Sequence, residues 1–366
     1  MNFLCFQVGA KRLEKAMEGI PDRIPVFAQM HEFVMHELKL SPSDFYLNPD
    51  VLVPGTLEVQ KRYGFDMGYI DYDIYNIEAE ALGQKVIYSD DSYPDADRND
   101  PLVKTHDDLK KIDTPDFLSD GRFPFVDRLN ILFKELTGLE PTLNFCAPFS
   151  LAANIRGIER LIYDIYEDPY FTRELFERIT ENVLVPWILF QKKRFPRAAA
   201  IVGSDATASI PIINMNILEE WVVPYIIRIR EICGSEVYVP NWVGERYLKD
   251  PEEMFEKKLT VCPGFLEGQD PDVESIGPER YKRYAEEHDV ALILGVGTRF
   301  LAESTPEEVI QRVKHYIEVG GKGGRFALYL CNLGKATSRE NVKAVFETIN
   351  MYGFYSGESD RDFLQY

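Results

Sequence analysis

Residues 291–330 read ALILGVGTRFLAESTPEEVIQRVKHYIEVGGKGGRFALYL, and this stretch carries the pattern that decides the fold. The apolar runs at 291–297 and 325–330 are typical of buried strands. Between them, residues 305–320 repeat apolar residues four positions apart, as one buried face of a helix requires: Val309, Val313 and Ile317. The glycine-rich residues 320–324 precede a strand and are predicted to form a turn. Two strands joined by a helix predict a parallel pair with a right-handed crossover.

The same alternation of strands and helices continues along most of the chain. Further strands are predicted at 24–29, 67–73, 142–147, 199–205, 236–242 and 264–268. Eight strands separated by helices favour a closed (β/α)8 TIM barrel. An open doubly wound sheet is the alternative, but neither nucleotide-binding glycine motif of that class occurs at a strand–helix junction. We predict an α/β protein with a single barrel domain over residues 1–366, an N-terminal helical extension and a β-containing excursion near residues 75–109.

The composition narrows the classes of partner. The 366 residues include 41 basic and 60 acidic side chains, which gives a net charge of −19. This charge repels a phosphate backbone and an anionic membrane surface, so neither nucleic acid nor membrane is an expected partner. No apolar run approaches the roughly 20 residues that span a bilayer, and the N-terminus lacks the pattern of a signal peptide. Five scattered cysteines favour reduced thiols. We expect a soluble, cytoplasmic protein.

Five segments, taken in order, resemble the uroporphyrinogen decarboxylase superfamily: 147–169, 203–209, 218–229, 297–309 and 331–345. The segment from Pro148 is similar to the family stretch G-P-[FL]-T-L-A. The last segment is similar to the family's cysteine-bearing strand end followed by T-P-x-E-N. The resemblance covers the chain from about residue 24 to about residue 352, and it implies an eight-stranded β/α barrel. A homodimer is common in the superfamily.

The superfamily holds two chemistries, decarboxylation of a porphyrinogen and methyl transfer to or from a cobalamin. Its decarboxylases carry an R-Q-A-G-R-Y segment after the first strand, where arginines anchor the substrate's carboxylates. Here residues 29–40 read QMHEFVMHELKL, with no arginine between Arg23 and Lys39. Each lost charged hydrogen bond costs about 1.5–3 kcal/mol of binding. The resemblance therefore favours methyl transfer over decarboxylation of a porphyrinogen.

Thiol-methylating members carry H-x-C-G at the end of the fifth strand and another cysteine at the end of the eighth, as zinc ligands. Aligned to this chain, the tetrapeptide falls on residues 241–244, of which only Gly244 is retained, and Cys331 keeps the last position. One thiolate cannot hold a zinc that normally takes three or four protein ligands. The remaining family role is a methyltransferase of an O-demethylase system. It would move methyl from an aryl methyl ether of the guaiacol or veratrole type to Co(I) of a separate corrinoid protein.

Such a reaction needs an acid or a Lewis acid, because a phenolate is a poor leaving group at neutral pH. Catalytic groups of β/α barrels lie at the carboxyl ends of the strands. This criterion selects Glu267, Asp205 and His31 as catalytic candidates. It selects as substrate-binding candidates Asp71, Tyr72, Asn144, Tyr238, Asn241, Trp242, Arg299, Cys331 and Asn332.

A second zinc arrangement is suggested by resemblance to ether-cleaving methyltransferases, with Glu252, Glu267 and His288 as ligands. His288 does not fit this set, since it is predicted to end a helix just before the seventh strand, on the opposite face of the barrel from Glu267. The cobalamin of the leading hypothesis belongs to the partner protein. The alternatives are a decarboxylase of a small carboxylic acid, a uroporphyrinogen-decarboxylase-like enzyme, or a corrinoid-binding scaffold without catalysis.

Overall fold

The computed structural model describes residues 3–89, 92–198 and 200–355. The chain forms two compact units that alternate along the sequence. The first comprises Val34–Thr56 and Ile70–Pro263, and the second comprises Phe3–Phe33, Leu57–Tyr69 and the chain from Gly264. Residues 90 and 91 of the predicted excursion and residue 199 of a predicted strand lie outside the described residues.

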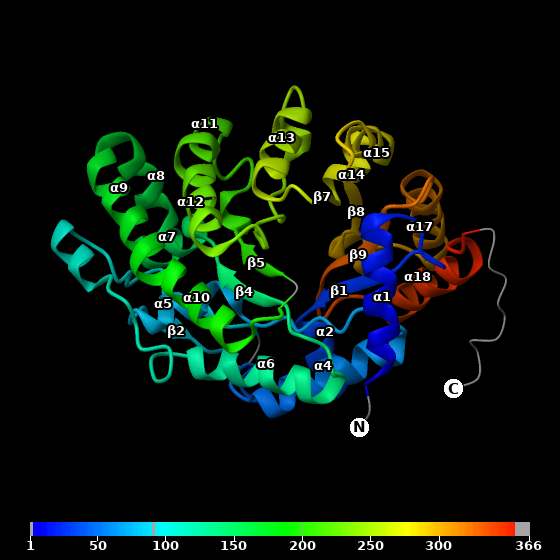
Figure 1. Cartoon of the computed structure of the whole chain (residues 1–366), viewed down its shortest axis with the longest axis horizontal. Coiled ribbons are helices and arrows are strands. Elements are labelled where there is room, and N and C mark those ends of the chain that lie inside the picture. The colour runs from blue at the N-terminus through cyan, green and yellow to red at the C-terminus, as the bar shows by residue number, and fades with distance from the viewer. Residues whose placement is uncertain (1–2, 90–91, 199, 356–366) are drawn as a thin grey trace. The chain divides into compact units, whose positions relative to one another are not determined.

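A parallel sheet forms the centre of the second unit, with strand order β1-β9-β8-β7 (Figure 1). Its strands are β1 (Val26–Met30), β7 (Phe265–Gln269), β8 (Ala291–Val296) and β9 (Phe326–Leu333). All neighbours in this sheet pair in parallel. Every residue of β8 is buried, as the apolar run in the sequence requires. Four predicted strands are therefore confirmed, including both strands of the segment 291–330.

The helices of the second unit are α1 (Cys5–Glu18), α14 (Asp272–Ile276), α15 (Pro278–Glu287), α16 (Thr298–Glu303), α17 (Pro306–Gly320) and α18 (Arg339–Tyr352). α1 is the predicted N-terminal extension, and α17 is the helix predicted at 305–320. Thr305 begins α17 with a reciprocal cap: its hydroxyl accepts from the Glu308 N–H at 3.3 Å, and its own N–H donates to the Glu308 carboxylate at 2.8 Å. The cap satisfies two backbone donors at the helix start.

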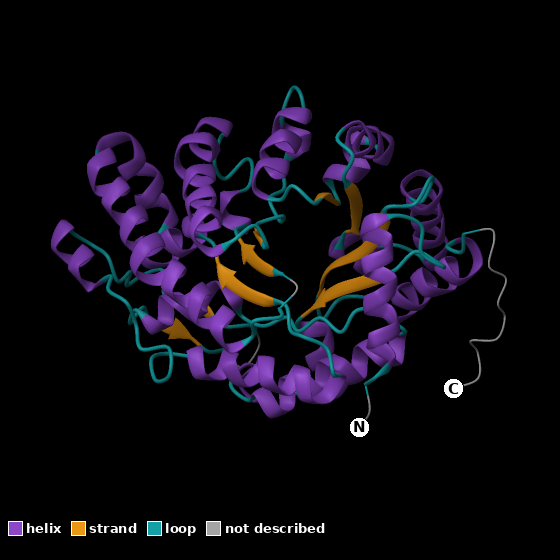
Figure 2. Cartoon of the chain, in the orientation of Figure 1, coloured by secondary structure: helices purple, strands orange, loops and turns teal. Residues whose placement is uncertain are grey.

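The main sheet of the first unit contains β4 (Leu143–Cys146), β5 (Ile201–Ser204) and β6 (Val237–Tyr238), in that order and all parallel. Figure 2 draws the strands in orange. Cys146 pairs with Ser204, so β4 and β5 end level with each other. β6 is shorter than the predicted strand at 236–242. Pro240 limits it, because proline has no N–H to donate to a neighbouring strand.

The excursion after residue 74 contains β structure, as predicted. It begins with two short helices, η1 (Ile74–Asn76) and α5 (Ile77–Ala81). The antiparallel pair β2 (Val86–Ile87) and β3 (Asp95–Ala96) follows, and the short helix η2 (His106–Lys111) closes the segment.

The remaining helices belong to the first unit or contain residues of both units. They are α2 (Glu32–Leu38), α3 (Pro42–Tyr46), α4 (Pro49–Tyr63), α6 (Phe123–Thr137), α7 (Pro148–Arg156), α8 (Ile158–Glu167), α9 (Pro169–Arg178), η3 (Ile179–Leu184), α10 (Val185–Arg194), η4 (Ala206–Ala208), α11 (Met215–Ile217), η5 (Leu218–Val222), α12 (Val223–Cys233), η6 (Glu245–Tyr247) and α13 (Glu252–Val261). Phe123 of α6 packs on Trp187 of α10 with ring centroids 4.2 Å apart. None of the helices in the described ranges is long and apolar enough to cross a bilayer.

The strand predicted at 67–73 is wrong, because these residues form no ladder with a neighbouring strand. Side chains bind the backbone there instead. The buried Gln60 carboxamide donates to the Tyr69 carbonyl at 2.6 Å. Nearby, the Val26 N–H donates to the Asp66 carboxylate at 2.8 Å. Because side chains satisfy backbone groups of this region, the segment does not need a neighbouring strand, although its apolar residues alternate as in a strand.

Candidate active site

Polar side chains gather in the first unit where β4, β5 and β6 end. Asp205 directly follows β5, and Asn241 lies three residues after the end of β6. Ala147 connects β4 to the start of α7. Because the three strands are parallel neighbours, their carboxyl ends bring these residues to one edge of the sheet.

The Asp205 side chain is completely buried, and its carboxylate binds both the start of α7 and the segment after β6. Its Oδ1 accepts the backbone N–H of Ser150 at 2.9 Å, and its Oδ2 accepts the indole N–H of Trp242 at 3.4 Å. Ser150 is the third residue of α7, whose N-cap, Ala147, has no side-chain oxygen, so Asp205 binds a donor of the helix start. Burial raises the pKa of Asp205 to about 6, against hydrogen bonds from Ser150 and Trp242 that lower it. The geometry gives Asp205 a positioning role, and its direct catalytic role stays a prediction.

Asn241 joins the backbone after β5 to the side chain of Tyr75. The Asp205 N–H donates to Asn241 Oδ1 at 2.9 Å, and Asn241 Nδ2 donates to the Tyr75 hydroxyl oxygen at 3.1 Å. The Ala206 N–H donates to the same hydroxyl oxygen at 3.2 Å. The Tyr75 carbonyl accepts from Asn154 Nδ2 at 2.6 Å. Asn241 was predicted to bind substrate, and the structure shows it holding Tyr75.

Glu78 is a buried carboxyl that the sequence analysis missed. It is the second residue of α5, and its Oε1 accepts the Cys146 N–H at the end of β4, at 3.0 Å. Its buried Oε2 has no hydrogen-bond partner among the described residues. Burial raises the pKa of Glu78 to about 8, opposed by the Cys146 N–H. Glu78 is therefore mostly a neutral acid at pH 7.

This raised pKa gives a testable dependence of stability on pH. The ordinary glutamate pKa is 4.5, so between pH 4.5 and about 8 the folded state keeps a proton that the unfolded state releases. The contribution to stability is complete below pH 4.5 and is lost as the pH rises through that window. As the pH rises from 4.5 to about 8, we expect the free energy of unfolding of the native protein to fall relative to that of Glu78→Gln. The fall should be at most about 1.4 kcal/mol per pH unit. Urea unfolding at several pH values measures the difference, and parallel pH profiles would contradict it.

The other binding candidates of the first unit lie at different depths. Trp242 is completely buried, so it supports Asp205 instead of facing an open pocket. Tyr72 is buried as well, and its pKa is raised by burial and then by the neighbouring charge of Glu78.

Three further substrate-binding candidates lie only partly where the sequence predicts them. Tyr238 lies within the strand predicted at 236–242 and is the last residue of the shorter β6. Asp71 is buried just before η1. Asn144 was expected to end its strand, and this is wrong: it is the second residue of β4, and its Nδ2 donates to the Thr142 carbonyl at 3.2 Å.

In the second unit, Glu267 and Cys331 face the same side of the sheet. Glu267 pairs with Ile293 in β8, and Cys331 packs in a cluster with Ile293. The Glu267 carboxylate accepts from Gln269 Nε2 at 2.6 Å. Burial, and then the charge of Glu267, raise the pKa of the Cys331 thiol well above its ordinary value. Cys331 is thus a buried thiol that packs in an apolar cluster on the same face as the Glu267 carboxylate.

Two predicted binding residues lie on the surface. Arg299 of α16 is exposed and pairs with Glu303 at 2.9 Å, so its binding role is not supported. Asn332 is also exposed, with a φ of 46°. At this point β9 has one more residue than β1, since Ala28 pairs with Leu330 but Met30 pairs with Leu333. Asn332 thus forms part of a β-bulge, where asparagine tolerates a left-handed backbone.

His31 follows β1 and precedes α2, which is its predicted place at a strand end. The zinc set receives no support. His288 ends α15 three residues before β8, where its ring stacks on Tyr284 with centroids 4.0 Å apart. Glu252 is the first residue of α13. In the part of the chain that the structure describes, no group of three or more His, Cys, Asp or Glu side chains is arranged to hold a metal.

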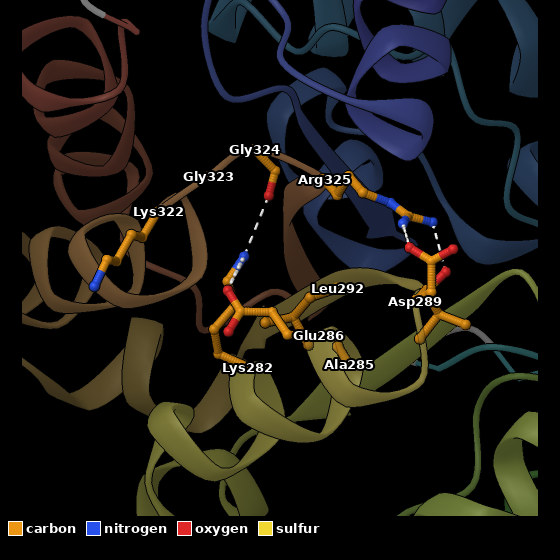
Figure 3. Close-up of a pocket in the computed structure, with 10 residues that line it drawn as sticks. Lys282, Ala285, Glu286, Asp289, Leu292, Lys322, Gly323, Gly324 and Arg325 are labelled. Carbon is orange, nitrogen blue, oxygen red and sulfur yellow. Dashed lines mark hydrogen bonds and ion pairs between the residues drawn. The ribbon is translucent and has the colours of Figure 1, made fainter.

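A pocket of about 170 Å³ lies in the second unit at the amino ends of strands β8 and β9 (Figure 3). Leu292, near the start of β8, and Arg325, just before β9, contribute to its lining. The Lys282 ammonium donates to the Gly324 carbonyl at 3.2 Å across it. The predicted turn at 320–324 is confirmed beside it. Catalytic groups of β/α proteins lie at the carboxyl ends of the strands, so this pocket is not a candidate active site.

Comparison with known proteins defines the class. The model of the uroporphyrinogen decarboxylase family matches residues 9–352, so the chain belongs to this family. A methyltransferase from Methanosarcina mazei is similar in structure, with a TM-score of 0.76 and 17% identity over 94% of this chain and 98% of that chain. The chain therefore has the TIM-barrel type of fold predicted from its sequence.

A second similar structure is a B12-independent methionine synthase from Shewanella sp. W3-18-1 in complex with selenomethionine. Its TM-score is 0.44 and its identity 12%, over 82% of this chain and 85% of that chain, which is too low to carry an argument. The search of curated proteins by sequence gave no significant match.

Proposed function

We propose that this protein is a methyltransferase that moves the methyl group of an aryl methyl ether to Co(I) of a separate corrinoid protein. The observation that supports it most is Glu78, a neutral carboxylic acid with a pKa of about 8 at the strand ends. The departing phenolate has a conjugate acid with a pKa of about 10, like tyrosine. Proton transfer from Glu78 to that oxygen is therefore downhill, and it lowers the barrier to ether cleavage.

The proposed step balances as follows. Co(I) attacks the methyl carbon, and the carbon–oxygen bond breaks with its electron pair going to oxygen. Cobalt becomes Co(III) as it gains the methyl group, and the aryl oxygen takes the proton of Glu78. A phenol leaves, and the Glu78 carboxylate is reprotonated from solvent. Cobalamin is a substrate carried by the partner in this scheme, and this chain supplies the acid and the binding of the ether.

The ion pairs of the protein argue against a substrate with many carboxylates. In the second unit, Arg23 pairs with Asp66 at 2.9 Å. In the first unit, Arg122 pairs with Asp73 at 2.5 Å, and Arg156 pairs with Asp164 at 2.6 Å. Releasing such an arginine to bind a substrate carboxylate would break its ion pair with a buried protein carboxylate, at a cost in stability. These arginines therefore do not serve as porphyrinogen anchors.

The function is tested with a panel of methoxyarenes and a reduced Co(I) corrinoid protein. Absorbance reports the conversion of Co(I) to methyl-Co(III), and chromatography reports the phenol. We expect both products in equal amounts with at least one guaiacol-type ether. Release of carbon dioxide from aromatic acids, with no methyl-Co(III) from any ether, would instead support the alternative of a small-acid decarboxylase.

A further inference from the structure

The hydrogen-bond roles around Tyr75 are fixed by its neighbours. A backbone N–H can only donate, so the Asp205 N–H requires the oxygen of Asn241 to face it. The NH2 group of Asn241 then faces Tyr75 and donates to its hydroxyl oxygen. Ala206 also contributes a backbone N–H to that oxygen. Tyr75 is thus the acceptor in both bonds, and both acceptor positions of its oxygen are filled.

The Tyr75 proton is consequently directed away from both neighbours. The described residues provide no acceptor for it, so it is left for water or a ligand. Burial raises the pKa of Tyr75, which keeps the hydroxyl protonated. Two N–H bonds to the same oxygen also polarise the O–H group and make it a stronger donor.

The position of this donor is set from both ends of the residue. Asn154 of α7 holds the Tyr75 carbonyl at 2.6 Å, and Asn241 and Ala206 hold the hydroxyl. Ala206 lies just after β5, next to the end of β4 where Glu78 binds the Cys146 N–H. Neighbouring strands are about 4.8 Å apart. The Tyr75 hydroxyl and the Glu78 carboxyl are therefore anchored at the ends of adjacent strands.

We infer that the Tyr75 O–H is a preset hydrogen-bond donor for an aryl oxygen, and that Asn241 positions it. The inference rests on the proposed function, since the oxygen it would bind is that of the methyl donor and of the phenolate it becomes. Tyr75 donates a hydrogen bond to this oxygen as negative charge develops, while Glu78 supplies the transferred proton. A donor already in place at a charging oxygen lowers the barrier without reorganisation.

The test uses 4-nitrophenol, whose phenol and phenolate forms differ in absorbance. Its ionisation is measured when bound to the native protein and to Tyr75→Phe. We expect the native protein to bind the phenolate about 10- to 100-fold more tightly than Tyr75→Phe does, the range of one charged hydrogen bond. Binding of the neutral phenol should change far less. Equal phenolate affinity in the two proteins, or no binding of 4-nitrophenol at millimolar concentration, would overturn the inference.

Two further variants separate positioning from general damage. Asn241→Ala should weaken phenolate binding in the same direction, and the double variant with Tyr75→Phe should be no weaker than Tyr75→Phe alone. Tyr163→Phe, on an exposed tyrosine of α8, is the matched control and should bind as the native protein does. Additive losses in the double variant would overturn the role of Asn241. A phenolate preference that depends on Tyr75, in a protein that demethylates no ether, would keep the donor site and overturn only the proposed function.

Discussion

Glu78→Gln is expected to slow methyl transfer by about 10²- to 10⁴-fold, the range for removal of a general acid. Glutamine keeps the shape of the side chain and an oxygen for the Cys146 N–H, but it cannot give a proton to the departing oxygen. Binding of the ether should change far less than the rate. The rate of the native enzyme should also fall above about pH 8, as Glu78 loses its proton, and this decline should be absent in the variant.

Single-turnover rates with a series of ethers measure the effect. The defect should shrink as the phenol becomes more acidic, because a better leaving group needs less help from an acid. Glu267→Gln is the informative comparison, since the sequence alone favours Glu267 as the acid. A larger loss in Glu267→Gln, or a Glu78→Gln defect that does not vary with the acidity of the phenol, would move the acid role away from Glu78.

Lys258→Met is expected to lower the free energy of unfolding by about 3–5 kcal/mol, because it removes the ammonium group from an ion pair between two buried side chains. Lys258 of α13 forms an ion pair with Glu245, and both side chains are almost completely enclosed. Glu245 begins η6, shortly after Asn241. The pair thus fixes α13 to the segment that positions Tyr75.

Urea unfolding of the single variant and of Glu245→Gln/Lys258→Met tests this pair. The double variant should recover most of the loss, since it leaves no buried charge without a partner. An equal loss in the single and double variants would mean that packing, and not the ion pair, holds this region.

The strands and the barrel class can be predicted from the sequence, because a strand that is buried on both faces of the sheet reads as a continuous apolar run. ALILGVG is apolar throughout, and β8 is buried throughout. The segment at 67–73 has a similar pattern, but Gln60 and Asp66 satisfy nearby backbone groups. That competition depends on side chains outside the segment, so local periodicity could not detect it.

The candidate site was harder to predict, because its contacts join distant parts of the chain. Asn241 and Tyr75 are 166 residues apart, and Glu78 binds an N–H that lies 68 residues away. In the sequence Glu78 is an acidic residue between two apolar ones, but no predicted strand end marks it. The strand-end rule selected Asp205, which the structure places, buried, directly after β5. It also selected Arg299, which is exposed because helix α16 turns that side chain to solvent.

The central claim is the cleavage of an aryl methyl ether with transfer of its methyl group. It is tested most directly with 4-hydroxy-3-methoxybenzoate, labelled with 13C in the methoxy carbon and with 14C in the carboxyl carbon, in the presence of a Co(I) corrinoid protein. This compound offers both competing reactions to the same site. We predict 13C in the methyl group bound to cobalt, an equal amount of 3,4-dihydroxybenzoate, and no radioactive carbon dioxide. Radioactive carbon dioxide together with an intact methoxy group would contradict the account.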